Sequence, residues 1–142
     1  MISFDTVTER ITYYFLATIA WTLIFLVVNK TLRFSSKIPK KEADDLRNRV
    51  VSIMHGLFAL FVSGYHIYKD KPQYADPATP IQHLILITSG AYFLYDTIAC
   101  HYYGLTDMSL YIHHIMCTVG ILTCEITNNA TTALSKMTFN AK

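Results

Sequence analysis

Three ionisable side chains stand out because they lie in long apolar stretches of the sequence. Asp96 is the one Asp, Glu, Lys or Arg between Ile81 and Tyr103, and His113 and His114 are adjacent near the start of the next stretch. A histidine can act as a general base near neutral pH, and a nearby carboxylate can orient its ring. The group predicts either a functional site at membrane depth or a polar contact between packed helices.

A second set of polar residues recurs at helical spacing in the same stretches. One set, separated by three or four residues, is Ser52, His55, Ala59, Ser63 and His66. The next stretch carries a similar face made of Gln82, Ser89, Tyr92, Asp96, Cys100 and Tyr103. Such spacing places side chains on one side of a helix. Four of these residues are candidates for a lipid-binding or polar face inside a bundle: Ser52, His55, Ser89 and Tyr92. The alternative is that they form interhelical hydrogen bonds of about 0.6 kcal/mol each.

The sequence predicts neither a metal site nor a cofactor. Adjacent residues such as His113 and His114 point about 100° apart on a helix, so both cannot easily bind one ion. The chain has no P-loop, glycine-rich nucleotide fingerprint, nucleophile elbow or zinc-protease motif. Its three cysteines lie in apolar segments without a CxxC pattern, which favours reduced thiols over disulfides: Cys100, Cys117 and Cys124.

The elements that must position these residues are transmembrane helices. The chain has 142 residues, 52% hydrophobic and only 15% charged, with a mean hydropathy of +0.29. Soluble domains usually carry about 25% charged residues. The composition excludes disorder, and a net charge of +2 gives no reason to bind nucleic acid. Four apolar runs are present, at residues 11–28, 50–68, 81–103 and 110–124. The sequence therefore predicts an all-α, polytopic transmembrane bundle of four spans.

The cost of placing a carboxylate in lipid predicts how the last two spans pack. Exposing Asp96 to hydrocarbon would cost about 3 kcal/mol, so it should face the bundle interior. The short connection at residues 104–109 makes these spans antiparallel neighbours, and Asp96 should face His113 or His114. The fourth run has only 15 residues before Glu125, so it should need partners to remain inserted.

Basic residues predict the orientation in the membrane. Residues 29–49 contain seven Lys and Arg residues and should form a cytoplasmic loop. Both chain ends would then lie on the opposite side of the membrane. The Asn129-Ala130-Thr131 sequon would face the glycosylating compartment, which makes Asn129 a candidate acceptor.

Three segments in order give the sequence a family resemblance. They are Arg47–His55 (RNRVVSIMH), Ser89–Asp96 (SGAYFLYD) and Leu110–His114 (LYIHH). Together they resemble the TLC domain of ceramide synthases, translocation-associated membrane proteins and small TLC-domain proteins, and the last group most. The resemblance implies a helical transmembrane bundle, usually of six or more spans. We therefore expect a first transmembrane helix and basic loop at residues 1–44 and a partial TLC-like domain at residues 45–142. Such a chain would be a short isoform, a fragment or a divergent form.

Three functions remain open at this point. The first is a non-catalytic TLC protein that binds or influences membrane lipids and acts in lipid homeostasis. The second is a structural subunit of a larger membrane complex. The third is an acyltransferase of the ceramide synthase type, which the resemblance implies with His113 or His114 as the base and Asp96 as the group that orients it. The acidic pattern that follows the His pair in those enzymes is absent here, where only Glu125 is acidic between residues 115 and 128. The expected partners are membrane lipids, other transmembrane subunits or a second copy of the chain. The expected location is the endoplasmic reticulum or another endomembrane, with the plasma and mitochondrial membranes as alternatives.

Overall fold

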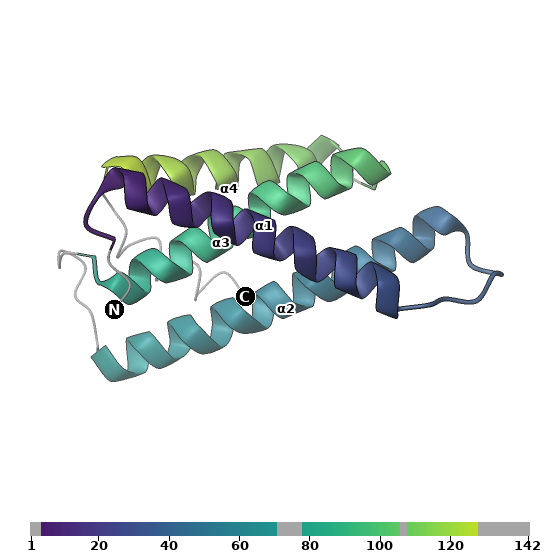
Figure 1. The fold of residues 1–142 in the computed structure, drawn as a ribbon, viewed down its shortest axis with the longest axis horizontal. Helices are drawn as coiled ribbons and strands as arrows, with labels where there is room; N and C mark the ends of the chain where they lie inside the picture. Colours follow the sequence, from purple (N-terminus) through teal and green to yellow (C-terminus); the bar gives the residue numbers. More distant parts are fainter. Residues whose placement is uncertain (1–3, 71–77, 106–107, 128–142) are drawn as a thin grey trace.

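The fold is a bundle of four long helices that alternate in direction (Figure 1). The computed structural model describes residues 4–70, 78–105 and 108–127. The helices are α1 (Val7–Thr31), α2 (Lys40–Asp70), α3 (Pro80–Tyr103) and α4 (Met108–Thr127). Each is long and apolar enough to cross a membrane. The predicted all-helical bundle of four spans is confirmed.

Local capping residues fix the ends of α3, the helix that carries Asp96. Thr79 accepts a hydrogen bond from the Gln82 backbone, and the Gln82 side chain accepts one from the Thr79 backbone. Pro80 occupies the first turn, where its missing N–H has no helical partner to lose. Gly104 ends the helix with a φ of 62°, a left-handed conformation that glycine adopts without a steric penalty.

Two predicted boundaries were wrong, both because helices continue beyond the apolar runs. The expected basic loop at residues 29–49 is largely helical, since α1 continues to Thr31 and α2 already begins at Lys40. Arg47 and Arg49 form ion pairs of 2.8 and 2.7 Å with Asp44 and Asp45 within this first part of α2. Pairs at this spacing stabilise a helix that has left the hydrocarbon.

The fourth helix also extends further than its apolar run. It has 20 residues and continues past Glu125, which the sequence had marked as the end of the span. Glu125 is buried because its carboxylate pairs with His83 of α3 at 2.8 Å. A charged residue can lie within a span when a partner compensates for its desolvation.

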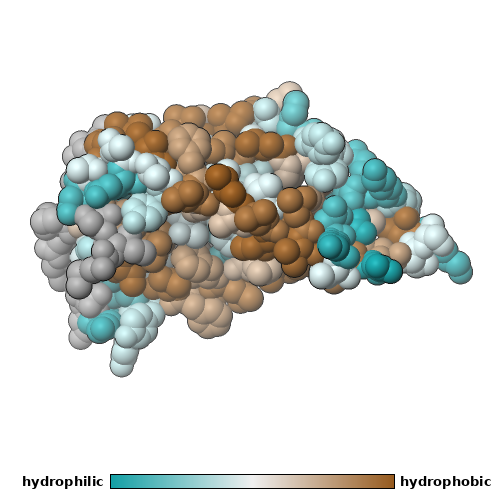
Figure 2. Space-filling view, viewed as in Figure 1, coloured by the Kyte–Doolittle hydropathy of each residue, from teal (hydrophilic) through white to brown (hydrophobic). Residues whose placement is uncertain are grey.

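Helix α3 occupies the centre of the bundle and packs against the other three helices. Within the described residues, α2 and α4 lie on different sides of it, and their backbones do not approach each other. On the face shown in Figure 2, apolar side chains cover the middle of the molecule, and hydrophilic ones gather at the end where α1 connects to α2. This distribution fits a bilayer-spanning bundle with a polar end.

Three helices approach one another closely at Gly90 of α3. A Cβ atom at this position would lie 2.7 Å from Cε2 of Tyr14 on α1 and 2.8 Å from Cγ2 of Ile121 on α4. Such distances are below normal carbon contacts. The absence of a side chain at Gly90 therefore allows α1 and α4 to pack against α3 together.

Candidate functional site

The carboxylate of Asp96 is the centre of a buried polar cluster. Its Oδ1 accepts a hydrogen bond from Nδ2 of Asn48 on α2 and a weaker one from the Cys100 thiol, with a sulfur–oxygen distance of 3.6 Å. Its Oδ2 lies 2.9 Å from Nδ1 of His114 on α4. All four residues are buried. The expected inward placement of Asp96 is confirmed, and each carboxylate oxygen has a neighbour that offsets its desolvation.

Of the two adjacent histidines, His114 is the one that lies against Asp96. The distance is that of an ion pair, although the ring is not angled for a good hydrogen bond. His114 is only 6% exposed, and its ring also packs against Phe93. The expected contact between Asp96 and one histidine of the pair is therefore present.

His113 points to a different side of α4, as the 100° step between adjacent residues requires. It is exposed, and its Nε2 lies 3.6 Å from the sulfur of Cys117 one turn later. Its ring meets the edge of Phe93 with a centroid distance of 6.2 Å. The structure therefore brings Asp96 and His114 together and leaves His113 on the exposed surface of α4.

Two tyrosines of α3 extend the cluster toward α2. The Tyr95 hydroxyl donates to Oδ1 of Asn48 at 2.7 Å, so Asn48 joins Tyr95 to Asp96. The Tyr92 hydroxyl donates to Oγ of Ser52 at 2.8 Å, and Ser52 donates to the Asn48 carbonyl at 3.1 Å. Hydrogen bonds between packed helices satisfy polar groups that would otherwise be costly in a membrane.

The other predicted polar residues lie close to this network without reaching the carboxylate. His55 of α2 stacks on the Tyr92 ring, with centroids 4.0 Å apart and planes 6° from parallel. Ser89 is fully buried, and its hydroxyl makes no hydrogen bond within the described ranges. Asn129, the candidate glycosylation site, lies outside the described residues.

The sequence analysis missed Asn48 as a member of the site. Asn48 lies four residues before Ser52 and so extends the polar face of α2 by one turn. It was assigned to the loop because the surrounding residues are charged. The i−4 spacing from Ser52 was the signal that could have identified it.

A second buried acid–histidine contact joins the start of α3 to the end of α4. Nδ1 of His83, near the start of α3, lies 2.8 Å from Oε2 of Glu125, near the end of α4. Both side chains are buried, and the Phe4 ring packs near His83 with a centroid distance of 5.9 Å. The α3–α4 interface therefore has an acid–histidine contact toward each end, one of which the sequence analysis did not predict.

The arrangement at Asp96 places an imidazole nitrogen 2.9 Å from a carboxylate oxygen in the interior of the bundle. Within the described residues, no group of three or more His, Cys, Asp or Glu side chains is placed to hold a metal ion.

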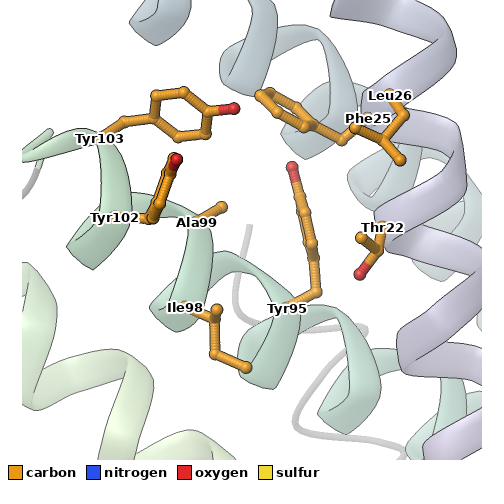
Figure 3. Close-up of a pocket in the computed structure, with 8 residues that line it drawn as sticks. All are labelled: Thr22, Phe25, Leu26, Tyr95, Ile98, Ala99, Tyr102 and Tyr103. Carbon is orange, nitrogen blue, oxygen red and sulfur yellow. The ribbon is translucent and has the colours of Figure 1, made fainter.

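An apolar cavity of about 170 Å³ lies between α1 and α3, lined in part by the ring of Tyr95 (Figure 3). Tyr95 separates this cavity from Asn48 and Asp96, because its ring lines the cavity while its hydroxyl binds Asn48.

Comparison with known families agrees with the three sequence segments. The family model described as the TLC domain matches residues 45–138, which is more than half of the chain. The match includes Asn48, Asp96 and both histidines, and it begins after α1. No solved structure matches the chain.

Proposed function

The chain belongs to the TLC domain family, and from this membership we propose that it is a non-catalytic member that binds or influences membrane lipids. It is a multi-pass integral membrane protein, with four apolar helices long enough to span a bilayer.

The observation that supports a non-catalytic role is that one histidine lies against Asp96 while the other is exposed. A general base must be oriented and must also reach the proton that it removes. Asp96 lies against His114, which is buried, whereas the exposed His113 has no contact with Asp96. Neither histidine combines both properties. The cluster instead resembles a packing centre in which α2, α3 and α4 satisfy one carboxylate.

One observation favours a second candidate function. The distance of 2.9 Å between His114 and Asp96 is the contact that a ceramide-synthase-like acyltransferase would need for an oriented base. In that mechanism the imidazole would remove a proton from an amine while the amine nitrogen attacks the carbonyl carbon of an acyl thioester. The carbon–sulfur bond would then break, and the sulfur would leave as a thiol with the proton that the imidazole had taken. Substrate access to His114 would require α2 or α4 to move.

An activity assay with a matched pair of variants separates the two functions. The chain in nanodiscs would be supplied with a long-chain base and acyl-coenzyme A, and amide product would be measured. We expect no turnover above protein-free nanodiscs. Turnover that is lost in His114→Gln and kept in His113→Gln would reject the non-catalytic proposal and support the acyltransferase.

A cellular experiment tests the lipid role itself. Deletion of the gene should change the composition of membrane lipids, and expression of the wild-type chain should restore it. We expect the His113→Gln variant to restore it equally well, because the exposed His113 does not contribute to the Asp96 cluster. An unchanged lipid composition after deletion would contradict the proposal and favour the structural-subunit alternative.

The proposed location is the endoplasmic reticulum or another endomembrane, where most membrane lipids are handled. The proposed partners are membrane lipids, with a second copy or another transmembrane subunit as the alternative. Fluorescence microscopy of the tagged chain tests the location. Native purification tests the partners: co-purified lipid with a single copy of the chain supports the first, and a stable protein complex supports the second.

A further inference from the structure

The apolar cavity between α1 and α3 lies toward the end of the bundle that carries the Lys- and Arg-rich residues 29–49, which we call the basic end. Its walls come from Thr22, Phe25 and Leu26 of α1 and from Tyr95, Ile98 and Tyr102 of α3, all in the C-terminal halves of their helices. In Figure 3 these side chains surround one space, with the ring of Tyr95 between the two helices. The cavity is a groove between α1, which precedes the matched TLC segment, and the central TLC helix.

The groove opens toward the lipid. Three residues on its walls are strongly exposed: Leu26 by 50%, Ile98 by 58% and Tyr102 by 79%. Its inner wall is closed by buried rings, since Phe25 packs against Tyr95 with centroids 6.0 Å apart. In a bilayer, an open apolar groove of this kind is filled by acyl chains.

Apolar walls alone would not select one lipid, because bilayer tails are as apolar as the groove. Selection must come from the headgroup end. Lys30 lies four residues after Leu26, and Leu26 four after Thr22, so the three share one face of α1. Lys30 is therefore about 6 Å further along the wall of the groove, toward the polar end of the bundle.

The positive charge of Lys30, at the basic end of the groove, is available to bind a lipid headgroup. Lys30 is exposed in the last turn of α1. Of the three acidic residues at the start of α2, Asp44 pairs with Arg47 and Asp45 with Arg49, while Glu42 is exposed in the first turn. Tyr102 adds an exposed phenol, a group that favours the headgroup region of a membrane.

We propose that the α1–α3 groove binds one anionic glycerophospholipid, with an acyl chain along Thr22, Leu26 and Ile98 and the phosphate near Lys30. The ligand belongs to the leaflet at the basic end of the bundle. The Tyr95 ring contacts the acyl chain and keeps it away from the Asp96 cluster. The inference deepens the proposed function, on which it rests for the class of ligand.

Native mass spectrometry of the full chain tests the site directly. The protein would be equilibrated with phosphatidylglycerol and phosphatidylcholine of identical acyl chains, and the retained lipids counted. We expect one retained phosphatidylglycerol. We expect Lys30→Gln to lower the preference for phosphatidylglycerol about fivefold, since a basic residue near an anionic headgroup contributes roughly that factor. Lys37→Gln, which removes an exposed lysine from the connection, is the matched control and should leave the preference unchanged.

Filling the groove supplies an independent test. Thr22→Phe places a ring in the groove from its exposed rim and should reduce retention of both phospholipids. Leu23→Phe adds a ring to an exposed position of α1 outside the groove, so it should retain lipid like the wild type. If Thr22→Phe does not fold, a photoreactive residue at Ile98 should crosslink phosphatidylglycerol, and one at Leu23 should show no preference between the two lipids.

Three results would overturn the proposal. They are equal retention of the two phospholipids by the wild type, the same preference in Lys30→Gln and wild type, and displacement of the phospholipid by a sterol. Failure of the proposed lipid site remains distinct from failure of the proposed function. A change in cellular lipids after deletion would still support that function if the groove proved not to bind an anionic lipid.

Discussion

Asn48 and His114 lie on two helices whose backbones do not approach each other within the described residues, yet both reach the carboxylate of Asp96. Asn48 donates to Oδ1 from α2, and His114 lies 2.9 Å from Oδ2 on α4. The side chain of Asp96 therefore connects α2 and α4 across the central helix. Stability should depend on these three residues as a unit.

The first prediction is that Asn48→Ala and His114→Ala are coupled. Asn48→Ala leaves Oδ1 of the buried carboxylate with only the weaker Cys100 thiol contact, and His114→Ala removes the neighbour of Oδ2. Each loss should cost about 1–3 kcal/mol. Because both act on the same Asp96 group, the double variant should differ from the sum by about 0.5 kcal/mol or more. The free energies of unfolding of the wild type, the two single variants and the double variant, measured in mixed micelles, give this coupling. Strict additivity would show that Asp96 does not join the two helices.

The second prediction distinguishes the adjacent histidines. His114→Leu should lower the melting temperature because it removes a neighbour of Asp96 from the interior. His113→Leu should have little effect or raise the temperature, because it replaces an exposed polar side chain with one that suits a lipid-facing surface. Circular dichroism in micelles measures both. Equal losses in the two variants would contradict the division between them.

The third prediction concerns helix packing at Gly90. Gly90→Ala should destabilise the bundle, because the new Cβ would lie 2.7 Å from the Tyr14 ring and 2.8 Å from Ile121. Overpacking of this kind typically costs about 1–3 kcal/mol. Gly120→Ala is the matched control, since nothing lies within 4 Å of its new Cβ. It should be neutral or stabilising by up to about 1 kcal/mol, as alanine favours helix formation. Melting temperatures of the two variants should therefore move apart.

The fourth prediction concerns the second acid–histidine contact. Glu125→Ala leaves the buried His83 without the carboxylate that lies 2.8 Å away. We expect faster hydrogen exchange near the start of α3 and the end of α4, with less change around Asp96. Ile126→Ala alters an exposed neighbour and serves as the control. Uniform changes throughout α3 would indicate that this contact supports the whole bundle instead of one end.

The fifth prediction is the orientation in the membrane. Ser36→Cys in the connection between α1 and α2 should react with an impermeant thiol reagent only from the cytoplasmic side, because the flanking segment is rich in Lys and Arg. A background variant with the three native cysteines replaced by serine or alanine provides the control. Asn129→Gln should remove any glycan from the chain. Labelling of Ser36→Cys from the lumen would reverse the proposed topology.

The sequence by itself determined the number of spans and the faces that carry polar residues. Apolar runs of adequate length require helices in a bilayer, because backbone groups there must satisfy one another within the segment. Spacing of three and four residues then places Ser52 and His55 on one side of a helix. These properties belong to single helices, so a linear pattern can reveal them. The cost of an exposed carboxylate likewise placed Asp96 inside the bundle.

Only the tertiary structure decided which side chains meet. His113 and His114 were equal candidates because their identities and neighbours in the sequence are alike, and the rotation of α4 about its axis selected His114. Asn48 belongs to the site because α2 begins at Lys40, ten residues before its apolar run starts at Val50. Hydropathy assigns these charged residues to a loop. The His83–Glu125 contact required antiparallel packing along the whole length of α3 and α4. Helix rotation, overlap and crossing depend on side-chain packing between distant segments, and no periodicity within one segment specifies them.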